Sequence, residues 1–178
     1  MTEGKEDAGP RFAVFRAKDA PSLEESGVMD AVPPSEAVLA GMAQVIDAGM
    51  GKGHFTRVLF AQGGMSLAYA WFKSGFPLPR HSHNSDCLYY IVGGSLRLGT
   101  EELKTGDGFF IGADVPYTYT PGENGVEVLE FRTAERFDIR TLASNPAFWA
   151  KAAITAAAKR DVWPTETISP SGLVTMEG

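Results

Sequence analysis

The sequence predicts a mostly β domain, a barrel or sandwich of short antiparallel strands flanked by an N-terminal and a C-terminal helix. Short apolar segments, separated by glycine and proline turns, continue for about 80 residues beyond position 54. A helical apolar pattern precedes this region and a second one follows it. The 178 residues, 44% of them hydrophobic and 21% charged, suffice for one well-buried core and are few for two domains.

The N-terminal extension, residues 1–54, is expected to contain an edge strand and a helix. Residues 1–11 are polar and are expected to be frayed, whereas residues 12–17 alternate weakly and predict the edge strand. Ser35 is a residue type that caps helices, and Glu36 places a negative charge at the helix start. The apolar residues of the predicted helix are Val38, Leu39, Met42, Val45 and Ile46. A glycine cluster at residues 49–53 is expected to end it.

The barrel itself is expected to span residues 55–140. Strands are predicted at residues 55–60, 66–73, 87–92, 95–98, 109–111, 117–120 and 126–132. The second strand is apolar on both faces, with Leu67, Tyr69 and Trp71 on one side and Ala68, Ala70 and Phe72 on the other. One face is therefore expected to line the barrel and the other to pack on a second layer.

The C-terminal segment, residues 141–178, is expected to form a helix and an extended tail. Asn145 followed by Pro146 has the form of an N-cap with proline at the first helical position. Phe148, Trp149, Ala152, Ala153 and Ala156 then give the helical spacing. Pro164 and Pro170 are expected to keep the tail extended.

Charge and composition exclude several function classes. The formal charge of −6 and the pI near 5.1 provide no overall basic surface, so nucleic acid is not an expected partner. The acidic start does not resemble a signal peptide, and no stretch approaches the roughly 18 apolar residues that a membrane span needs. A single cysteine cannot form an internal disulfide, which agrees with a reducing compartment. We expect a cytoplasmic protein without a membrane partner.

The stretch of residues 75–94 concentrates the groups capable of metal chemistry. It contains His81 and His83, two of the three histidines, and Cys87, the only cysteine. Residues two apart in an extended strand point to the same face, so the two imidazoles are expected to lie side by side. Together they predict a platform for a metal ion, with Cys87 as a third candidate ligand. His54, the remaining histidine, is expected at the surface or in a loop, with the barrel mouth as the alternative position.

This stretch resembles the first motif of the cupin family. The matching positions are Gly75, His81, His83, Cys87 and Gly94, where Cys87 occupies the usual glutamate position. Residues 106–117 resemble the second motif, whose usual proline, glycine and histidine fall at Gly112, Asp114 and Tyr117. The match covers roughly residues 55–132. It implies a cupin barrel, a jelly roll or double-stranded β-helix, open at one end and accompanied by flanking helices.

The resemblance also implies a metal site. Cupins bind iron, manganese, nickel, zinc or copper through the two histidines and the glutamate of the first motif and the histidine of the second. This sequence keeps His81 and His83, and it has Cys87 and Tyr117 at the other two positions. Because a thiolate favours softer or borderline metals, we predict a divalent transition metal, iron, zinc, nickel or copper, held by His81, His83 and Cys87.

Two alternatives stay open for the less usual residues of this site. Cys87 is either a ligand or a small buried hydrophobe. Tyr117 is either a ligand or a pocket wall, and Tyr117 and Tyr89 are also the candidate catalytic proton donors. If the histidines point inward, Cys87, Tyr89 and Ile91 are expected to do the same. The aromatic residues Tyr69, Trp71, Tyr119 and Phe131 are either core residues or, on the inner face of the barrel, pocket residues. The predicted substrate pocket consists of these four residues and Ile91.

Two function classes follow. In the first, the protein is a small metal-dependent enzyme, dioxygenase-like or lyase- or isomerase-like, which acts on a small organic molecule. In the second, the barrel binds a small molecule without turnover at a degenerate or metal-free site. Cupins resemble one another in pairing barrels through edge strands, so a homodimer is expected, with residues 12–17 as a candidate pairing strand.

Overall fold

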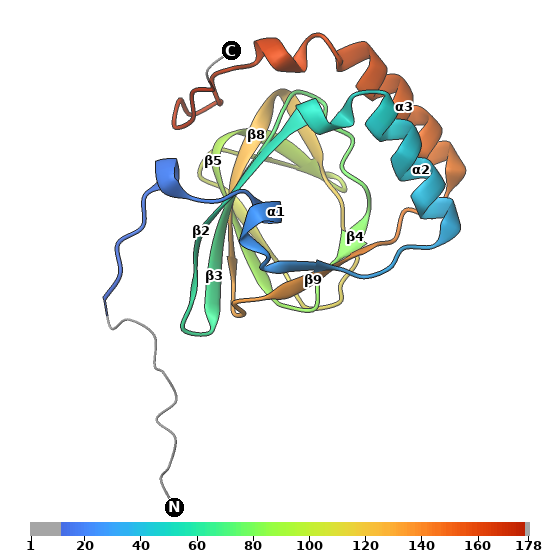
Figure 1. Ribbon diagram of the computed structural model, residues 1–178. Helices are drawn as coiled ribbons and strands as arrows, with labels where there is room; N and C mark the ends of the chain where they lie inside the picture. Colours follow the sequence, from blue (N-terminus) through green and yellow to red (C-terminus); the bar gives the residue numbers. More distant parts are fainter. Residues whose placement is uncertain (1–11, 177–178) are drawn as a thin grey trace, which may run out of the picture.

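The computed structural model describes residues 12–176. Two β-sheets, in which most strand pairs are antiparallel, form a barrel (Figure 1). The six-stranded sheet has the order β2-β3-β8-β5-β6, and β7 also pairs with β5. Its strands are β2 (His54–Gln62), β3 (Met65–Phe72), β5 (Cys87–Leu98), β6 (Glu101–Lys104), β7 (Gly108–Ile111) and β8 (Thr120–Arg132). The three-stranded sheet has the order β1-β9-β4, with β1 (Met29–Ala31), β4 (His81–Ser82) and β9 (Phe137–Thr141). The predicted mostly β jelly-roll barrel with flanking helices is confirmed.

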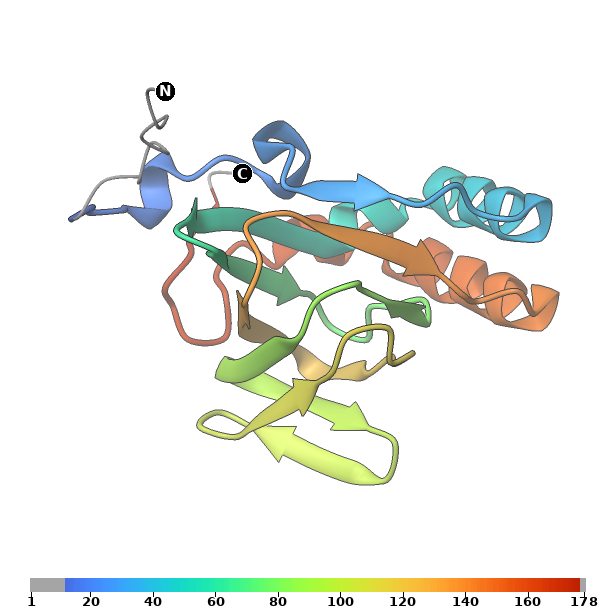
Figure 2. The same cartoon turned by 90° about the horizontal axis from the view of Figure 1, so that it is seen from below.

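Two long helices cover one side of the barrel, as Figures 1 and 2 show. Helix α2 (Glu36–Asp47) and helix α3 (Pro146–Lys159) begin at the predicted caps, because Ser35 and Asn145 accept hydrogen bonds from backbone N–H groups of the first turns. Trp149 of α3 packs directly on Gly41 of α2, where a Cβ atom would lie 2.2 Å from the indole. The absence of a side chain at position 41 therefore lets the two helices approach.

Short helical turns connect the remaining elements. They are η1 (Ala17–Asp19), α1 (Leu23–Ser26), η2 (Met50–Gly53) and η3 (Trp163–Thr165). No helix in residues 12–176 combines the length and apolar character needed to cross a membrane.

The predicted edge strand at residues 12–17 is wrong. Residues 12–16 form no strand, and η1 begins at Ala17. Phe12 and Val14 are exposed, so no packing stabilises an extended pairing there. The N-terminal strand is instead β1, which pairs in parallel with β9. Residues 1–11, expected to be frayed, lie outside the described residues.

One pair of predicted strands is joined into a longer one, because the strands expected at 87–92 and 95–98 form the single strand β5. The strand expected at 126–132 begins earlier, at Thr120, and forms β8 despite Pro121 and Gly122. The strand expected at 117–120 does not form, and its Tyr117 makes only an isolated bridge to His81. Register shifts interrupt the β5–β8 ladder near Gly93 and Gly94 without ending it. Gly94 has φ 74°, and a Cβ there would lie 2.2 Å from the carbonyl oxygen of Gly125. The glycines in this region thus permit close strand contact where a turn was predicted.

The register of the sheet determines which side chains face the barrel interior. In the β5–β8 ladder Cys87 pairs with Arg132, Tyr89 with Glu130 and Ile91 with Val128. The main apolar core contains Cys87, Tyr89, Ile91, Leu96, Tyr117, Tyr119, Val126, Val128 and Ala70. The prediction that Cys87, Tyr89 and Ile91 share the inward parity of the histidines is confirmed.

The opposite face of the same sheet is partly covered by the C-terminal tail. Tyr69, whose hydroxyl donates to Glu127 Oε1 over 2.6 Å, lies on this outer face. The backbone N–H and the hydroxyl of Ser171 also donate to the Glu127 carboxylate, which is fully buried. The tail is therefore anchored to the sheet by hydrogen bonds to a buried carboxylate.

Candidate metal and substrate site

A cavity of about 190 Å³ lies inside the barrel between the two sheets. Its lining consists of His54, Phe72, Phe76, Leu78, Pro79, His81, His83, Tyr117, Tyr119, Glu130, Ile139 and Thr141. A larger surface hollow of about 1110 Å³ is lined partly by β5 and β6, and neither histidine nor cysteine contributes to it. The smaller cavity is therefore the candidate site, because it collects the histidines, tyrosines and a carboxylate.

His81 and His83 lie side by side, as the sequence predicts. Their ring centroids are 5.1 Å apart. His81 belongs to β4, which pairs with β9, and its backbone N–H and C=O both bond to Tyr117. The Nδ1 of His81 lies 2.7 Å from the carbonyl oxygen of Pro79, and the Nδ1 of His83 lies 2.5 Å from that of Asp138. Since a carbonyl oxygen only accepts, both rings carry their proton on Nδ1, which leaves the Nε2 lone pairs available.

Burial keeps both imidazoles neutral. It lowers the pKa of His81, and it lowers the pKa of His83 to about 4, with the positive charge of Arg132 as the next cause. A neutral imidazole with a fixed Nδ1–H is the form that binds a metal ion or accepts a proton through Nε2. The pair therefore presents two acceptor atoms at neutral pH.

Two tyrosines, Tyr117 and Tyr119, line the cavity beside the histidines, and Tyr89 lies behind them. The ring of Tyr117 lies 4.5 Å from that of His81, and its hydroxyl is hydrogen-bonded to the hydroxyl of Tyr89. Burial raises the pKa of Tyr89, Tyr117 and Tyr119, so all three stay protonated at neutral pH. Tyr89 sits behind Tyr117 and contacts it through the hydroxyl pair.

Cys87 faces the interior without joining the histidines in a metal cluster. Among residues 12–176 no group of three or more histidine, cysteine, aspartate or glutamate side chains has metal-binding geometry. Burial raises the pKa of the Cys87 thiol to about 12, so the thiol is protonated at neutral pH. The environment of Cys87 in the apolar core is that of a small packed side chain.

A glutamate and an arginine complete the site, and neither belongs to the two motifs. Glu130 lines the cavity, and its Oε2 accepts a hydrogen bond from Arg132 Nη2 over 2.7 Å. The Arg132 guanidinium is buried, lies 4.0 Å over the centroid of Phe137, and is 3.5 Å from the Tyr89 hydroxyl. The sequence contains a signal for this pair, because both residues follow Val126 and Val128 at the same inward parity of β8.

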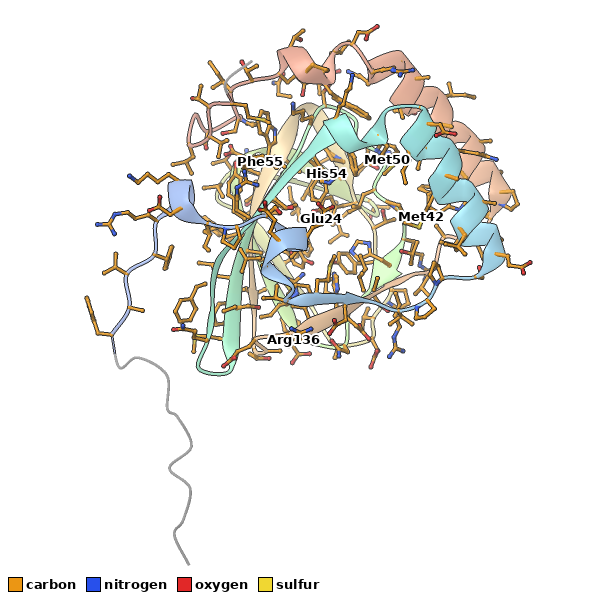
Figure 3. The ribbon with its side chains drawn as sticks, viewed as in Figure 1. Glu24, Met42, Met50, His54, Phe55 and Arg136 are labelled. Carbon is orange, nitrogen blue, oxygen red and sulfur yellow. The ribbon has the colours of Figure 1, made fainter. Side chains whose placement is uncertain are left out.

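His54 also lines the cavity, which agrees with the alternative position at the barrel mouth and not with the expected surface or loop position. It begins β2, and its ring packs against Phe76 with centroids 5.5 Å apart. Burial lowers its pKa, and its Nδ1 has no hydrogen-bond partner in the described residues. Figure 3 labels His54, at the start of β2, together with Glu24 of α1, whose negative charge opposes this lowering of the pKa. The glycine turn before His54 had suggested exposure, but η2 and β2 direct this residue inward.

Part of the predicted substrate pocket lies elsewhere. Tyr119 lines the cavity, and Ile91 is fully buried in the adjoining core. Tyr69, Trp71 and Phe131 belong to the outer face of the six-stranded sheet, where their pairing partners are Leu129, Glu127 and Leu67. The assignment of these three side chains to the pocket is therefore wrong. Both faces of β3 are apolar, so the sequence pattern alone does not select the inner one.

Asp114, at a position where the sequence comparison expects glycine, has a left-handed backbone. This residue has φ 60°, the left-handed conformation that the usual glycine adopts easily and that aspartate tolerates. Its N–H donates to the carbonyl oxygen of His83 over 2.7 Å. The loop after β7 (Gly108–Ile111) thus holds the histidine segment through its backbone.

Solved structures share the fold of this chain at low sequence identity. An RmlC-like cupin from Shewanella frigidimarina is 21% identical over 46% of this chain and 77% of its own, with a TM-score of 0.41. KdgF from Halomonas is 20% identical over 46% and 79% of the two chains, with a TM-score of 0.40. The polyketide cyclase RemF from Streptomyces resistomycificus is 20% identical over 60% and 84%, with a TM-score of 0.49. No family model matches the chain, and no curated protein matches it in sequence.

Proposed function

We propose that this cupin-type barrel binds a divalent transition metal ion through His81 and His83 and acts on a small organic molecule in the adjoining cavity. One observation carries the proposal: each Nδ1 is bound to a backbone carbonyl, which leaves two neutral Nε2 atoms as ligands. Iron, zinc, nickel and copper all accept imidazole. A bound ion of this kind supplies Lewis-acid or redox chemistry to a substrate oxygen or carbonyl group.

The other motif positions fit a metal less well than the histidines do. Cys87 is a protonated thiol within the core, and the Tyr117 hydroxyl is engaged by Tyr89. The proposed shell therefore contains two protein ligands, and water or substrate would complete it. Tyr117 is the proposed proton donor to substrate, because it is protonated and lines the cavity. Tyr89 supports it through the hydroxyl pair.

Elemental analysis of protein purified without an affinity tag or added metal tests this proposal. We expect near-stoichiometric iron, zinc, nickel or copper in the wild type and none in the His81→Ala/His83→Ala double variant. A Cys87→Ala variant is the matched control and should retain the metal of the wild type. Absence of metal from the wild type, even after dialysis against each of the four ions, would refute the proposed metal site.

A non-catalytic small-molecule binder is the second candidate. The observation in its favour is that no three-residue metal cluster exists among residues 12–176. In that case the cavity binds its ligand through the tyrosines and histidines without turnover. Ligand binding that is unchanged by chelator, together with metal-free protein, would select this candidate.

A homodimer and a cytoplasmic location are also part of the proposal. The predicted pairing strand does not form, but Leu88, Tyr90 and Phe110 are exposed neighbours on the outer face of β5 and β7. An uncharged apolar surface of this kind supports association between copies. Sedimentation velocity should give a dimer for the wild type and a monomer for Phe110→Asp, and a monomeric wild type would contradict the proposed dimer.

A further inference from the structure

We infer that Glu130 is the substrate-orienting carboxylate of the cavity and that it selects a single-ring molecule carrying a neutral hydroxyl donor. The inference deepens the proposed function by naming its substrate class, and it takes the same cavity as the binding site. It depends on the free oxygen of Glu130, on the charges of Glu130 and Arg132, and on the cavity's size and apolar lining.

The Glu130 carboxylate has one oxygen fixed and one available. Oε2 accepts the hydrogen bond from Arg132 Nη2, and no described residue donates a hydrogen bond to Oε1. The Arg132 side chain is 1% exposed and that of Glu130 is 15% exposed. The arginine therefore holds the carboxylate from behind, while the remaining oxygen is available to a ligand. A carboxylate oxygen in such a position accepts strong, charge-assisted hydrogen bonds.

Glu130 Oε1 is the charged acceptor of the cavity wall. The Nε2 atoms of His81 and His83 also accept where no metal occupies them, and the hydroxyls of Tyr117, Tyr119 and Thr141 can donate or accept. The unpartnered Nε and Nη1 of Arg132 are fully buried and not exposed to a ligand. A carboxylate ligand would meet the like charge of Glu130, and an ammonium would add a positive charge beside a carboxylate whose charge Arg132 already balances. A neutral hydroxyl avoids both conflicts.

Size and lining define the body of the ligand. The volume of about 190 Å³ exceeds the roughly 150 Å³ of an apolar cavity known to bind benzene, so the cavity accommodates one substituted ring. The apolar part of the wall is formed by Phe72, Phe76, Leu78, Tyr119 and Ile139. Aromatic walls of this kind favour a flat apolar ring. A monocyclic phenol or enol satisfies both the wall and the carboxylate.

Phenol, anisole and benzylamine are the probes, measured by isothermal titration calorimetry and ligand-observed NMR. Phenol and anisole share the ring, but anisole lacks the hydroxyl proton. We expect wild-type protein to bind phenol about tenfold or more tightly than either anisole or benzylamine, because a charged acceptor strengthens the hydrogen bond. Equal binding of phenol and anisole, or tighter binding of benzylamine, would overturn the inference without any mutation.

Glu130→Gln is the diagnostic variant, since glutamine still accepts a hydrogen bond from Arg132. It should bind phenol about tenfold more weakly and leave anisole unchanged, because a neutral acceptor replaces a charged one. Glu101→Gln, at an exposed position of β6, is the matched control and should behave as the wild type. Unchanged phenol affinity in Glu130→Gln, or an equal loss in Glu101→Gln, would refute the role of Glu130.

Metal content, measured on the same samples, separates this inference from the proposed metal site. Equal metal content in wild type and Glu130→Gln, with weaker phenol binding in the variant, supports both. A phenol preference that depends on Glu130 in protein without metal would refute the metal site and sustain the role of Glu130. Loss of metal in Glu130→Gln would instead make Glu130 a metal ligand and overturn the inference.

Discussion

Replacement of Arg132 by methionine should strongly destabilise the barrel. Methionine preserves much of the side-chain volume but leaves the Glu130 carboxylate without the partner that lies 2.7 Å away. Removal of one member of a buried ion pair costs about 3–5 kcal/mol, since the other charge stays in a medium of low polarity. Loss of the guanidinium contact with Phe137, 4.0 Å from the ring centroid, adds to this. For a protein of 178 residues the change corresponds to a Tm lower by about 10 °C.

Urea denaturation at pH 7 measures this effect in a double-mutant cycle. The four proteins are the wild type, Arg132→Met, Glu130→Gln and the double variant. Because Glu130→Gln removes the stranded charge, the double variant should be more stable than the sum of the single effects by about 1–3 kcal/mol. A loss below about 1 kcal/mol in Arg132→Met, or strict additivity in the cycle, would refute the buried ion pair as the support of the cavity.

Three further predictions concern single side chains. Burial lowers the pKa of His83 from 6.5 to about 4. The contribution of the neutral imidazole to folding stability should therefore be complete above pH 6.5 and disappear as the pH falls towards 4. Thermal melts of metal-free protein should show this loss, and His83→Asn should make the Tm depend less on pH. With its pKa raised to about 12, Cys87 should react with a disulfide reagent at pH 8 about a thousandfold more slowly in folded than in urea-unfolded protein, and comparable rates would contradict its burial. Tyr69→Phe should lower the free energy of unfolding by about 1–2 kcal/mol, because the buried Glu127 carboxylate loses a donor; an unchanged urea midpoint would exclude a stabilising role for the Tyr69–Glu127 hydrogen bond.

The helices and the histidine pair were accessible from the sequence because local rules define them. Ser35 and Asn145 cap the helices whatever the rest of the chain does. His81 and His83 lie together because a two-residue spacing in extended backbone places side chains on one face. The same parity correctly predicted the inward direction of Cys87.

Errors arose where a choice depended on partners distant in the sequence. Residues 12–17 have a strand-like pattern but bury too little apolar surface to pair. Gly94 is a turn residue by its type, yet in β5 it relieves a close contact with Gly125 of β8. Because the strand of Trp71 is apolar on both faces, its sequence does not show whether this side chain points into the pocket. Only the pairing with β8 shows that Trp71 points outward.

The sequence by itself determined the mostly β barrel, its two capped helices and the histidine pair, since these follow from periodicity and from residues close together in the chain. Tertiary structure alone decided which face of each strand lines the cavity, and it brought His54 and Glu130 to the motif histidines. Glu130 lies 47 positions beyond His83 in the sequence, and it joins the site because β8 pairs with β5 inside the barrel. Burial within the barrel then determines the protonation of these groups, because desolvation depends on the whole fold.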